Sequence, residues 1–355
     1  MLTSLKARQL RCFDTVQCEF GEGVTIFVGS NAQGKTSILE AVCIAMRLQS
    51  PRTSSLGEVI QFEKSEFAVS SEFRDQQLLV GYKQANRKLS VDGTAMRRSG
   101  DYLEHSGRVV WMANDDLDLI RGGGDGRRRY LDFMGTQLFP GYRPALRAYE
   151  RALRSRNFLL KRDARPNWAQ IDAYTKVLAE HGAVLTSCRA ELVMSLDPFS
   201  AEVQREVSGA REALTLTYKS GDGDRLVEVL AELREEESKR RSTIRGPHRD
   251  DLLLSLNGMP AGQFASEGQQ RTVALALKIG QARLFHERAD SWPLLLLDDI
   301  FGELDPTRRN ALMSALPGDA QKLITTTHLD WLDERLAPDL EYRVVSGAVE
   351  RQPDR

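Results

Sequence analysis

The segment that most constrains this chain is GSNAQGKT at residues 29–36, which follows the apolar stretch VTIFV at residues 24–28. It fits the pattern GxxxxGK[ST], and the residues after it, Lys35 to Met46, carry apolar side chains at helical spacing. A glycine-rich turn between a strand and a helix directs successive backbone N–H groups at an anion. We expect this loop to hold the phosphates of ATP through Gly29, Ser30, Asn31, Ala32, Gln33, Gly34, Lys35 and Thr36.

Two side chains of this loop have expected roles in the chemistry. Lys35 should reach the β and γ phosphates, and the Thr36 hydroxyl should bind Mg²⁺. The alternative is a glycine-rich turn between a strand and a helix that binds no nucleotide.

A second motif is LLLLDD at residues 294–299, a short apolar run that ends in two carboxylates. A buried strand that ends in a carboxylate can supply the second Mg²⁺ contact, and Asp298 is expected in that role. Asp299 is then placed to orient or deprotonate an attacking water. Alone, the motif is equally consistent with a buried strand that ends at a capped turn.

The order of the later motifs resembles that of the ABC ATPase class. Residues 266–271, SEGQQR, resemble the ABC signature, in which Ser266, Gly268 and Gln269 would contact a nucleotide held by the other subunit. Glu267 departs from the common pattern, which has glycine there, and the string is also that of an ordinary helix N-cap. Asp305 of GELD resembles a loop that faces the dimer partner, and His328 after TTT resembles a switch histidine that contacts the γ-phosphate.

The chain as a whole reads as α/β, with strands that alternate with helices in its outer thirds. Residues 127–211 are helical in pattern, residues 214–218 and 252–256 are expected strands, and residues 223–241 are an expected charged helix. We expect an ABC-type ATPase head, a P-loop NTPase with a mixed sheet, over residues 1–121 and 243–355. A mostly helical arm over residues 122–242 would be inserted into it, and residues 214–218 are compatible with either lobe.

A finer resemblance is to the RecF family, in the branch of ABC ATPases that includes SMC and Rad50. The strings that carry it are NAQGKT at 31–36, RRRYLD at 127–132, GPHRDD at 246–251, and LDDI at 297–300 with ELD at 303–305. The resemblance implies a DNA-repair protein that forms an ATP-dependent homodimer. It implies binding to duplex and gapped DNA, slow hydrolysis with Asp299 as the base, and the partners RecR, RecO and RecA.

Basic residues gather in one stretch although the formal net charge of the chain is only −1. Residues 141–170 hold eight basic and two acidic side chains, a local charge of +6. Such a stretch predicts phosphate contact without base readout, and the alternative is a solvated helical face. The candidate DNA contacts are Arg127, Arg128, Arg129, Arg143, Arg147, Arg151, Arg154, Arg156, Lys161 and Arg162. Further candidates are Arg165 and the residues Arg87, Lys88, Arg97 and Arg98.

The remaining composition points to the cytoplasm, where we expect an association with the nucleoid. No stretch approaches the roughly 18 apolar residues that span a bilayer, and the four cysteines form no CxxC pair. Two rival functions stay open. One is the ATP-binding subunit of a membrane transporter, and the other is a DNA-binding module that ATP switches with negligible turnover.

Overall fold

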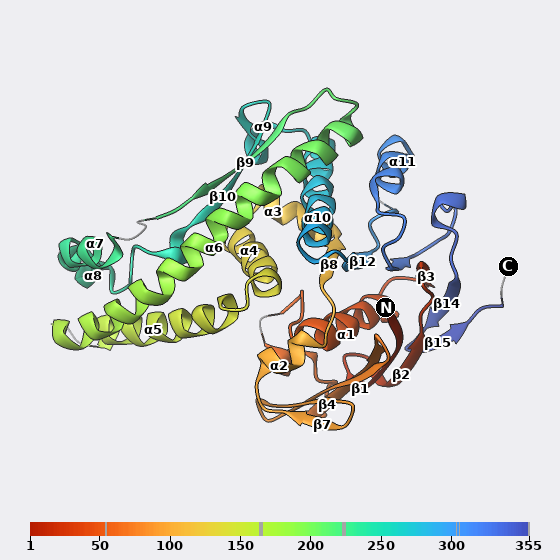
Figure 1. Ribbon diagram of the computed structural model, residues 1–355, viewed down its shortest axis with the longest axis horizontal. Helices are drawn as coiled ribbons and strands as arrows, with labels where there is room; N and C mark the ends of the chain where they lie inside the picture. Colours follow the sequence, from red (N-terminus) through yellow and green to blue (C-terminus); the bar gives the residue numbers. More distant parts are fainter. Residues whose placement is uncertain (54, 163–165, 222–224, 303, 305, 354–355) are drawn as a thin grey trace. The chain divides into compact units, whose positions relative to one another are not determined.

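The computed structural model describes residues 1–53, 55–162, 166–221, 225–302, 304 and 306–353. The chain divides into two compact units. The first unit joins Met1–Asp116 to Ala282–Arg355, and the second unit is Leu117–Gln281. Figure 1 labels the helices and strands of both.

An antiparallel sheet of the first unit has the strand order β2-β1-β4-β5-β6-β7. Its strands are β1 Leu2–Leu10, β2 Phe13–Glu19, β4 Glu66–Phe73, β5 Gln76–Lys83, β6 Asn86–Val91 and β7 Thr94–Met96. Alternate side chains such as Phe67 and Val69 of β4 are buried, which is the pattern of a sheet with one covered face. The tight turn after β6 contains Gly93 at φ +77°, as the Asp-Gly pair there predicts.

A second sheet of the first unit has the order β15-β14-β3-β13-β12-β8. Its strands are β3 Val24–Val28, β8 Val109–Ala113, β12 Leu294–Asp298, β13 Lys322–Thr326, β14 Leu340–Val345 and β15 Ala348–Arg351. All neighbours pair in parallel except β14 and β15, which form an antiparallel hairpin. Because β3, β13 and β12 are adjacent and parallel, their carboxyl ends meet at one edge of the sheet.

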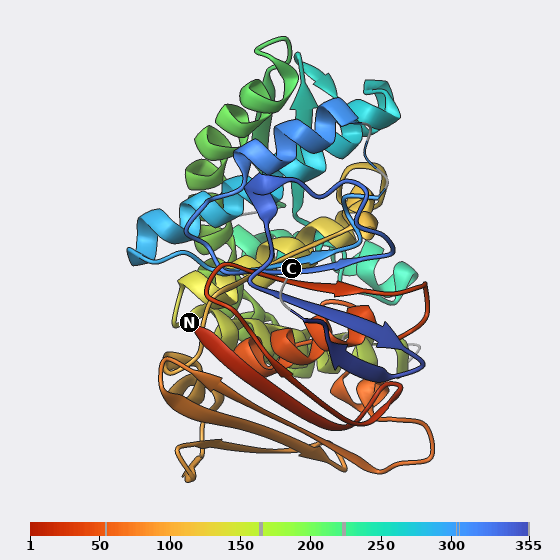
Figure 2. The ribbon, with the colours of Figure 1, turned by 90° about the vertical axis from the view of Figure 1, so that its right-hand side faces the viewer.

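Helix α1, Lys35–Arg47, contacts strands of both sheets, among them β1 and β4 of one and β12 and β13 of the other. Figure 2 shows it between the two layers. This position explains why α1 is buried nearly all round, whereas its sequence pattern had indicated a single apolar face. The other helical segments of the first unit are η1 Leu56–Val59, α2 Ser99–Glu104, α11 Pro306–Ala315 and η5 Glu334–Leu336, and η2 Asn114–Leu117 lies at its boundary with the second unit.

Long helices dominate the second unit. Its helical segments are α3 Asp118–Arg121, α4 Gly124–Leu138, α5 Tyr142–Arg162, α6 Trp168–Ser208, α7 Leu226–Glu232, α8 Arg234–Arg240, η4 Pro247–Arg249 and α9 Ala261–Phe264. Helix α10, Glu267–Ala289, begins in this unit and ends in the first. Tyr142, Tyr149, Leu178 and Leu185 form the core where α5 and α6 pack side by side (Figure 1).

A small antiparallel sheet completes the second unit, in the order β11-β10-β9. Its strands are β9 Leu214–Lys219, β10 Asp251–Leu256 and β11 Met259–Pro260. Residues 214–219 and 251–256 are therefore neighbouring strands of one sheet, and they lie in the same compact unit. The compact units differ in their bounds from the expected head over 1–121 and 243–355 and arm over 122–242, and this pairing accounts for the part of the difference at residues 251–256.

The expected α/β class with a mostly helical insertion is confirmed by these elements. The charged helix expected over residues 223–241 is instead two short helices, α7 and α8, which meet at Leu233. Four free cysteines are present, of which Cys18 and Cys43 are buried. Within the described residues, no helix has both the length and the apolar character needed to cross a membrane.

Candidate functional site

The loop between β3 and α1 passes close to its neighbours because two positions are glycine. A Cβ on Gly29 would lie 2.3 Å from the backbone oxygen of Val344. Gly34 has φ +108°, and a Cβ there would lie 2.7 Å from Phe13 Cζ and 2.8 Å from Cys12 Sγ. Only glycine combines a positive φ with the absence of a Cβ, and Gly34 needs both. The loop and the start of α1 therefore have the backbone conformation of a phosphate-binding loop.

Lys35 folds back over this loop. Its Nζ donates to the backbone oxygens of Gly29 at 2.5 Å and of Ser30 at 2.9 Å. Burial lowers the pKa of Lys35, and the charges of Asp299 and Asp298 oppose that shift. The ammonium is thus held at the loop by carbonyl acceptors, in reach of any anion that the loop binds.

Asp298 joins three elements of the site at the carboxyl edge of the parallel sheet. Its Oδ1 accepts hydrogen bonds from Thr36 Oγ1 at 2.8 Å and from Thr325 Oγ1 at 2.7 Å. Burial raises the pKa of Asp298, and these two hydrogen bonds act in the opposite direction. The carboxylate of Asp298, at the end of β12, therefore links the first turn of α1 to the end of β13.

Asp299 and His328 lie beside this group. Asp299 has φ +52°, and its N–H donates to Thr325 Oγ1 at 3.0 Å. A Cβ on Gly302 would be 3.7 Å from Asp299 Oδ1 and 4.0 Å from His328 Nε2, so both side chains flank that glycine. His328 is about half exposed, and its Nδ1 lies 3.5 Å from Asp330 Oδ2. The first unit thus brings together Lys35, Thr36, Asp298, Asp299 and His328.

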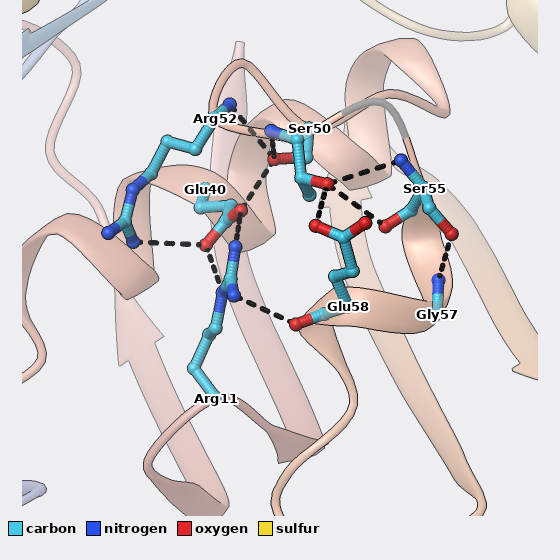
Figure 3. Close-up of polar contacts among 8 residues, drawn as sticks. Arg11, Glu40, Ser50, Arg52, Ser55, Gly57 and Glu58 are labelled. Atoms are coloured by element: carbon cyan, nitrogen blue, oxygen red, sulfur yellow. Dashed lines mark hydrogen bonds and ion pairs between the residues drawn. The ribbon is translucent and has the colours of Figure 1, made fainter.

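Sequence reasoning missed a polar cluster that anchors α1, drawn in Figure 3. Glu40 is fully buried, and Arg11 binds both of its carboxylate oxygens at 2.8 and 2.7 Å. Ser50 Oγ donates to Glu40 Oε1 at 2.5 Å, and Arg52 Nη1 lies 3.5 Å from Oε2. The sequence feature that could have indicated this cluster is Glu40, a lone carboxylate within an apolar helix. A carboxylate buried in such a helix requires a partner.

This cluster positions the turn between β1 and β2. Arg11 and Cys12 both lie in that turn, and Cys12 Sγ is one of the atoms that a Cβ on Gly34 would meet. Arg11 also donates to the backbone oxygen of Glu58 at 2.8 Å. The ion pair therefore fixes a turn that borders the phosphate loop.

The SEGQ segment opens α10 in the second unit as a capping box. Ser266 N–H donates to Gln269 Oε1 at 2.8 Å, and Gln269 N–H donates to Ser266 Oγ at 3.3 Å. Glu267 is paired with Arg271 at 3.0 Å and with Arg121 at 3.7 Å, which neutralises its charge locally. Gly268 lies in the first turn of α10. Asp305, like Glu303, lies outside the described residues.

The candidate DNA contacts separate into exposed and internally bound residues. Arg156 is 1% exposed and binds Glu237 through its two terminal guanidinium nitrogens, Nη1 at 2.8 Å and Nη2 at 2.6 Å. Arg143 is also buried. Arg127 is bound to both oxygens of Asp251, and Arg128 to Asp125 and to the backbone oxygen of Asp250. All four were expected to contact DNA. The structure instead shows Arg127, Arg128 and Arg156 bonded inside the second unit, and Arg143 buried.

The exposed candidates in the second unit are Arg129, Arg147, Arg151, Arg154, Lys161 and Arg162. Arg165 lies outside the described residues. The remaining candidates lie in the first unit, where all four are exposed: Arg87, Lys88, Arg97 and Arg98.

The strings RRRYLD and GPHRDD meet in one network of the second unit. Arg189 Nη2 binds Asp132 Oδ1 at 2.6 Å and its Nη1 donates to the backbone oxygen of Pro247 at 2.8 Å. Asp250, 1% exposed, accepts from Arg189 at 3.3 Å and from the N–H of Gly221 at 2.8 Å.

His248 belongs to the same region. It accepts from Tyr149 Oη at 2.7 Å and donates to the backbone oxygen of Thr243 at 3.0 Å. Burial lowers the pKa of His248 to about 4, so its neutral form is favoured. The two strings are therefore structural contacts between α4, α6 and η4.

Comparisons with known proteins agree with this arrangement. The AAA domain family matches residues 4–127. The DNA replication and repair protein RecF of Synechococcus sp. (strain JA-2-3B'a(2-13)) is 38% identical and covers 94% of this chain and 92% of its own length. The protein of the same name from Shouchella clausii (strain KSM-K16) is 33% identical over 99% of both chains.

Solved structures give the same result. A structure of the recombination mediator protein RecF with ATP, in the RecFOR pathway, superposes with a TM-score of 0.88, at 28% identity over 99% of this chain and 97% of that one. An Smc head bound to the C-terminal winged-helix domain of ScpA has a TM-score of 0.54 at 14% identity, covers 99% of this chain and 96% of that one, and shows a shared fold alone. On the evidence of its full-length relatives, the chain belongs to the RecF family of DNA replication and repair proteins.

Proposed function

We propose that this chain binds ATP and Mg²⁺ at the site of the first unit, and that two copies close around two ATP molecules and hold DNA until hydrolysis releases it. The observation that carries the proposal is the convergence of Thr36 and Thr325 on Asp298, directly after a loop whose lysine is held at its carbonyls. This is the side-chain set that phosphoryl-transfer sites use.

The donor set at Asp298 suits Mg²⁺. A threonine hydroxyl and a carboxylate are hard oxygen ligands, and the two lie within hydrogen-bond distance of each other, at 2.8 Å. Bound there, Mg²⁺ would neutralise charge on the β and γ oxygens of ATP. A cation would also favour the carboxylate form of Asp298, whose pKa burial raises.

The roles of the other side chains follow from their positions. Lys35 would exchange the carbonyl oxygens of Gly29 and Ser30 for phosphate oxygens, which are stronger acceptors for an ammonium. Asp299 would take a proton from the attacking water as the water oxygen bonds to the γ-phosphorus and ADP leaves. His328 would donate to a γ-phosphate oxygen. Aspartate is one methylene shorter than glutamate, and we therefore propose slow hydrolysis.

The composite site would be completed by the other copy. Ser266, Gly268 and Gln269 open a long helix, and a helix start favours an anion. Glu267 is neutralised by Arg271 and Arg121, so its charge does not oppose a phosphate there. We propose that these residues of one copy face the γ-phosphate held by Lys35 and Thr36 of its partner. Asp305 would face the same dimer interface.

DNA and protein partners come to this chain through its family. Relatives are DNA replication and repair proteins, and one solved relative is assigned to the RecFOR pathway. We propose duplex and gapped DNA as ligands, RecR and RecO as partners, delivery to RecA, and a place at the nucleoid. The phosphate contacts would be Arg129, Arg147, Arg151, Arg154, Lys161 and Arg162, which are exposed.

Light scattering tests the proposal directly. Molar mass is measured without nucleotide and with ATP–Mg²⁺, for the wild type, Lys35→Met, Ser266→Arg and the control Lys64→Met, which changes an exposed lysine away from the site. A shift from monomer to dimer with ATP in the wild type and control, absent from the other two, supports the composite site. A monomer that binds ATP without any change in mass contradicts it.

One alternative keeps the same site. If Asp299 is too short to activate water, ATP would act as a switch with negligible turnover. Phosphate release, measured with and without DNA, separates the two, because a DNA-stimulated ATPase releases phosphate faster when DNA is present. Membership of the RecF family disfavours the transporter alternative.

A further inference from the structure

The outward face of α5 carries a continuous row of side chains. Arg147, Arg151, Arg154, Phe158 and Lys161 follow each other at intervals of three or four residues, which places them on one side of a helix. All five are exposed. Buried residues of α5, such as Tyr149, Ala152 and Leu159, lie at the helical positions between them. The row therefore faces away from the core that α5 forms with α6.

Phe158 is the unusual member of this row. Its side chain is 61% exposed, although its neighbours Leu159 and Leu160 are buried. The guanidinium carbon of Arg162 lies 5.9 Å from the centre of its ring, within the range of a cation–π contact. Glu150 lies beside the row, with its carboxylate 4.0 Å from Arg154. An exposed aromatic ring thus lies within a row of cations, between Arg154 and Lys161.

We infer that this face of α5 is a DNA surface on which the arginines contact phosphates and Phe158 stacks on an unpaired base. The inference rests on the proposed DNA binding and adds the side chain, Phe158, that would distinguish gapped DNA from duplex. A base in a duplex is covered by its neighbours on both faces, so a phenyl ring can stack only on a base in a single strand or at a junction. Arginines, in contrast, contact the backbone of either form.

The dimensions of the row suit a junction. At 1.5 Å per residue, Arg147 and Phe158 are separated by about 16 Å along α5, which is the length of about five base pairs of duplex. A duplex end held along the arginines would then place its first unpaired base at Phe158. Charge complementarity selects DNA over a protein partner, because the row presents four cations, and among the described residues Arg154 alone has a carboxylate within ion-pair distance.

DNA-binding measurements with the full-length protein, ATP and Mg²⁺ test this inference. Fluorescence anisotropy gives the affinity for a labelled duplex, a single strand and a gapped duplex at one fixed salt concentration. The variants are Phe158→Ala, Phe158→Trp and the triple variant Arg147→Gln, Arg151→Gln, Arg154→Gln. Met194→Ala is the control, because Met194 is an exposed apolar residue, 72% exposed, on α6 of the same unit. Thermal unfolding checks that all variants fold.

We expect Phe158→Ala to weaken binding to single-stranded and gapped DNA by about fivefold or more, and to leave duplex binding unchanged. Phe158→Trp should retain the affinity, since indole also stacks. The triple variant should weaken all three complexes. If the ratio of gapped to duplex affinity in Phe158→Ala equals that of the wild type, the inference is overturned. The exposed ring of Phe158 would then be a contact for a protein partner. If the triple variant also binds all three DNAs like the wild type, the proposed DNA surface fails as well.

Discussion

The buried ion pair of Arg156 and Glu237 offers a quantitative test of the second unit. Both side chains are almost completely buried, and Arg156 also donates to Thr175 at 3.0 Å and Thr243 at 2.8 Å. Replacing Arg156 by methionine keeps much of its volume but leaves the Glu237 carboxylate without its cation. Breaking such a pair costs about 3–5 kcal/mol. For a unit of this size, the unfolding temperature should fall by about 6–20 °C.

A second substitution separates the effect of the uncompensated charge on stability from the effect of the changed packing. Replacing Glu237 by methionine in the Arg156→Met background removes the uncompensated carboxylate, and a buried pair exchanged for apolar residues is often neutral in stability. We therefore expect the double variant to recover most of the lost stability in thermal unfolding followed by circular dichroism. A double variant as unstable as Arg156→Met would refute the reasoning, as would a fall of less than about 2 °C in the single variant.

The same variants test the sequence-based assignment of Arg156 to DNA. Below its unfolding transition, the double variant should bind duplex DNA like the wild type, because the guanidinium of Arg156 is inside the protein. Arg154→Met is the matched control, since Arg154 is exposed two positions away on the same helix. It should weaken duplex binding. Equal losses in both would place Arg156 at the DNA surface after all.

Three further predictions concern other parts of the chain. Gly93→Ala, at positive φ but with no atom within 4 Å, should cost about 1–2 kcal/mol of stability and leave ATP binding unchanged. Gly34→Ala should cost more, because its Cβ would also clash with Phe13 and Cys12, and should weaken ATP binding in calorimetry. Because burial lowers the pKa of His248 to about 4, the unfolded chain binds the proton more readily between pH 6.5 and 4. The wild type should therefore lose about 3 kcal/mol of stability across that window relative to His248→Gln, measured by denaturant unfolding, and parallel pH profiles would contradict this. Glu40→Gln should destabilise the first unit by about 1–3 kcal/mol in thermal unfolding, because Arg11 loses a charged acceptor, and an unchanged unfolding temperature would contradict this.

The phosphate loop and its carboxylate were predictable because their signals are local. A β-branched strand, a glycine turn and a helix start occupy 23 consecutive residues from Val24 to Met46, and each follows from short-range sterics and hydrogen bonding. The strand in LLLLDD is also a local signal, since a run of four apolar residues is typical of a strand inside a parallel sheet, whereas the role expected of Asp298 depended on the phosphate loop elsewhere in the chain.

The strands β1 and β2 were not predicted, although residues 2–19 form both. Charged side chains such as Lys6 and Arg8 interrupt their apolar pattern, because one face of this sheet is uncovered. Strand β1 pairs with β4, more than 50 residues away in the sequence, and β2 pairs with β1 at the edge of the sheet. Such pairing is a tertiary effect that a local pattern does not contain.

The misassignment of Arg156 to the surface has a different origin. Arg156 follows Ala152 by four positions and Tyr149 by seven, so its helical phase matches the buried face of α5. The sequence analysis had grouped Arg156 with the exposed arginines because it considered only the density of basic residues. Its partner Glu237 lies 81 residues further along the chain, and nothing in the sequence around either residue identifies the other.

The strand order of the parallel sheet has a consequence for synthesis of the protein on the ribosome. Strand β3, which leads into the phosphate loop, lies between β13 and β14, and the nearer of these begins 294 residues after Val28. At translation rates of about 5–20 residues per second, β3 waits roughly 15–60 s for its neighbours. The antiparallel sheet that begins with β1 is complete at residue 96, long before then. A nascent chain would therefore carry an ordered first layer and an unformed nucleotide site for most of its synthesis, and would gain affinity for ATP only in its final stage.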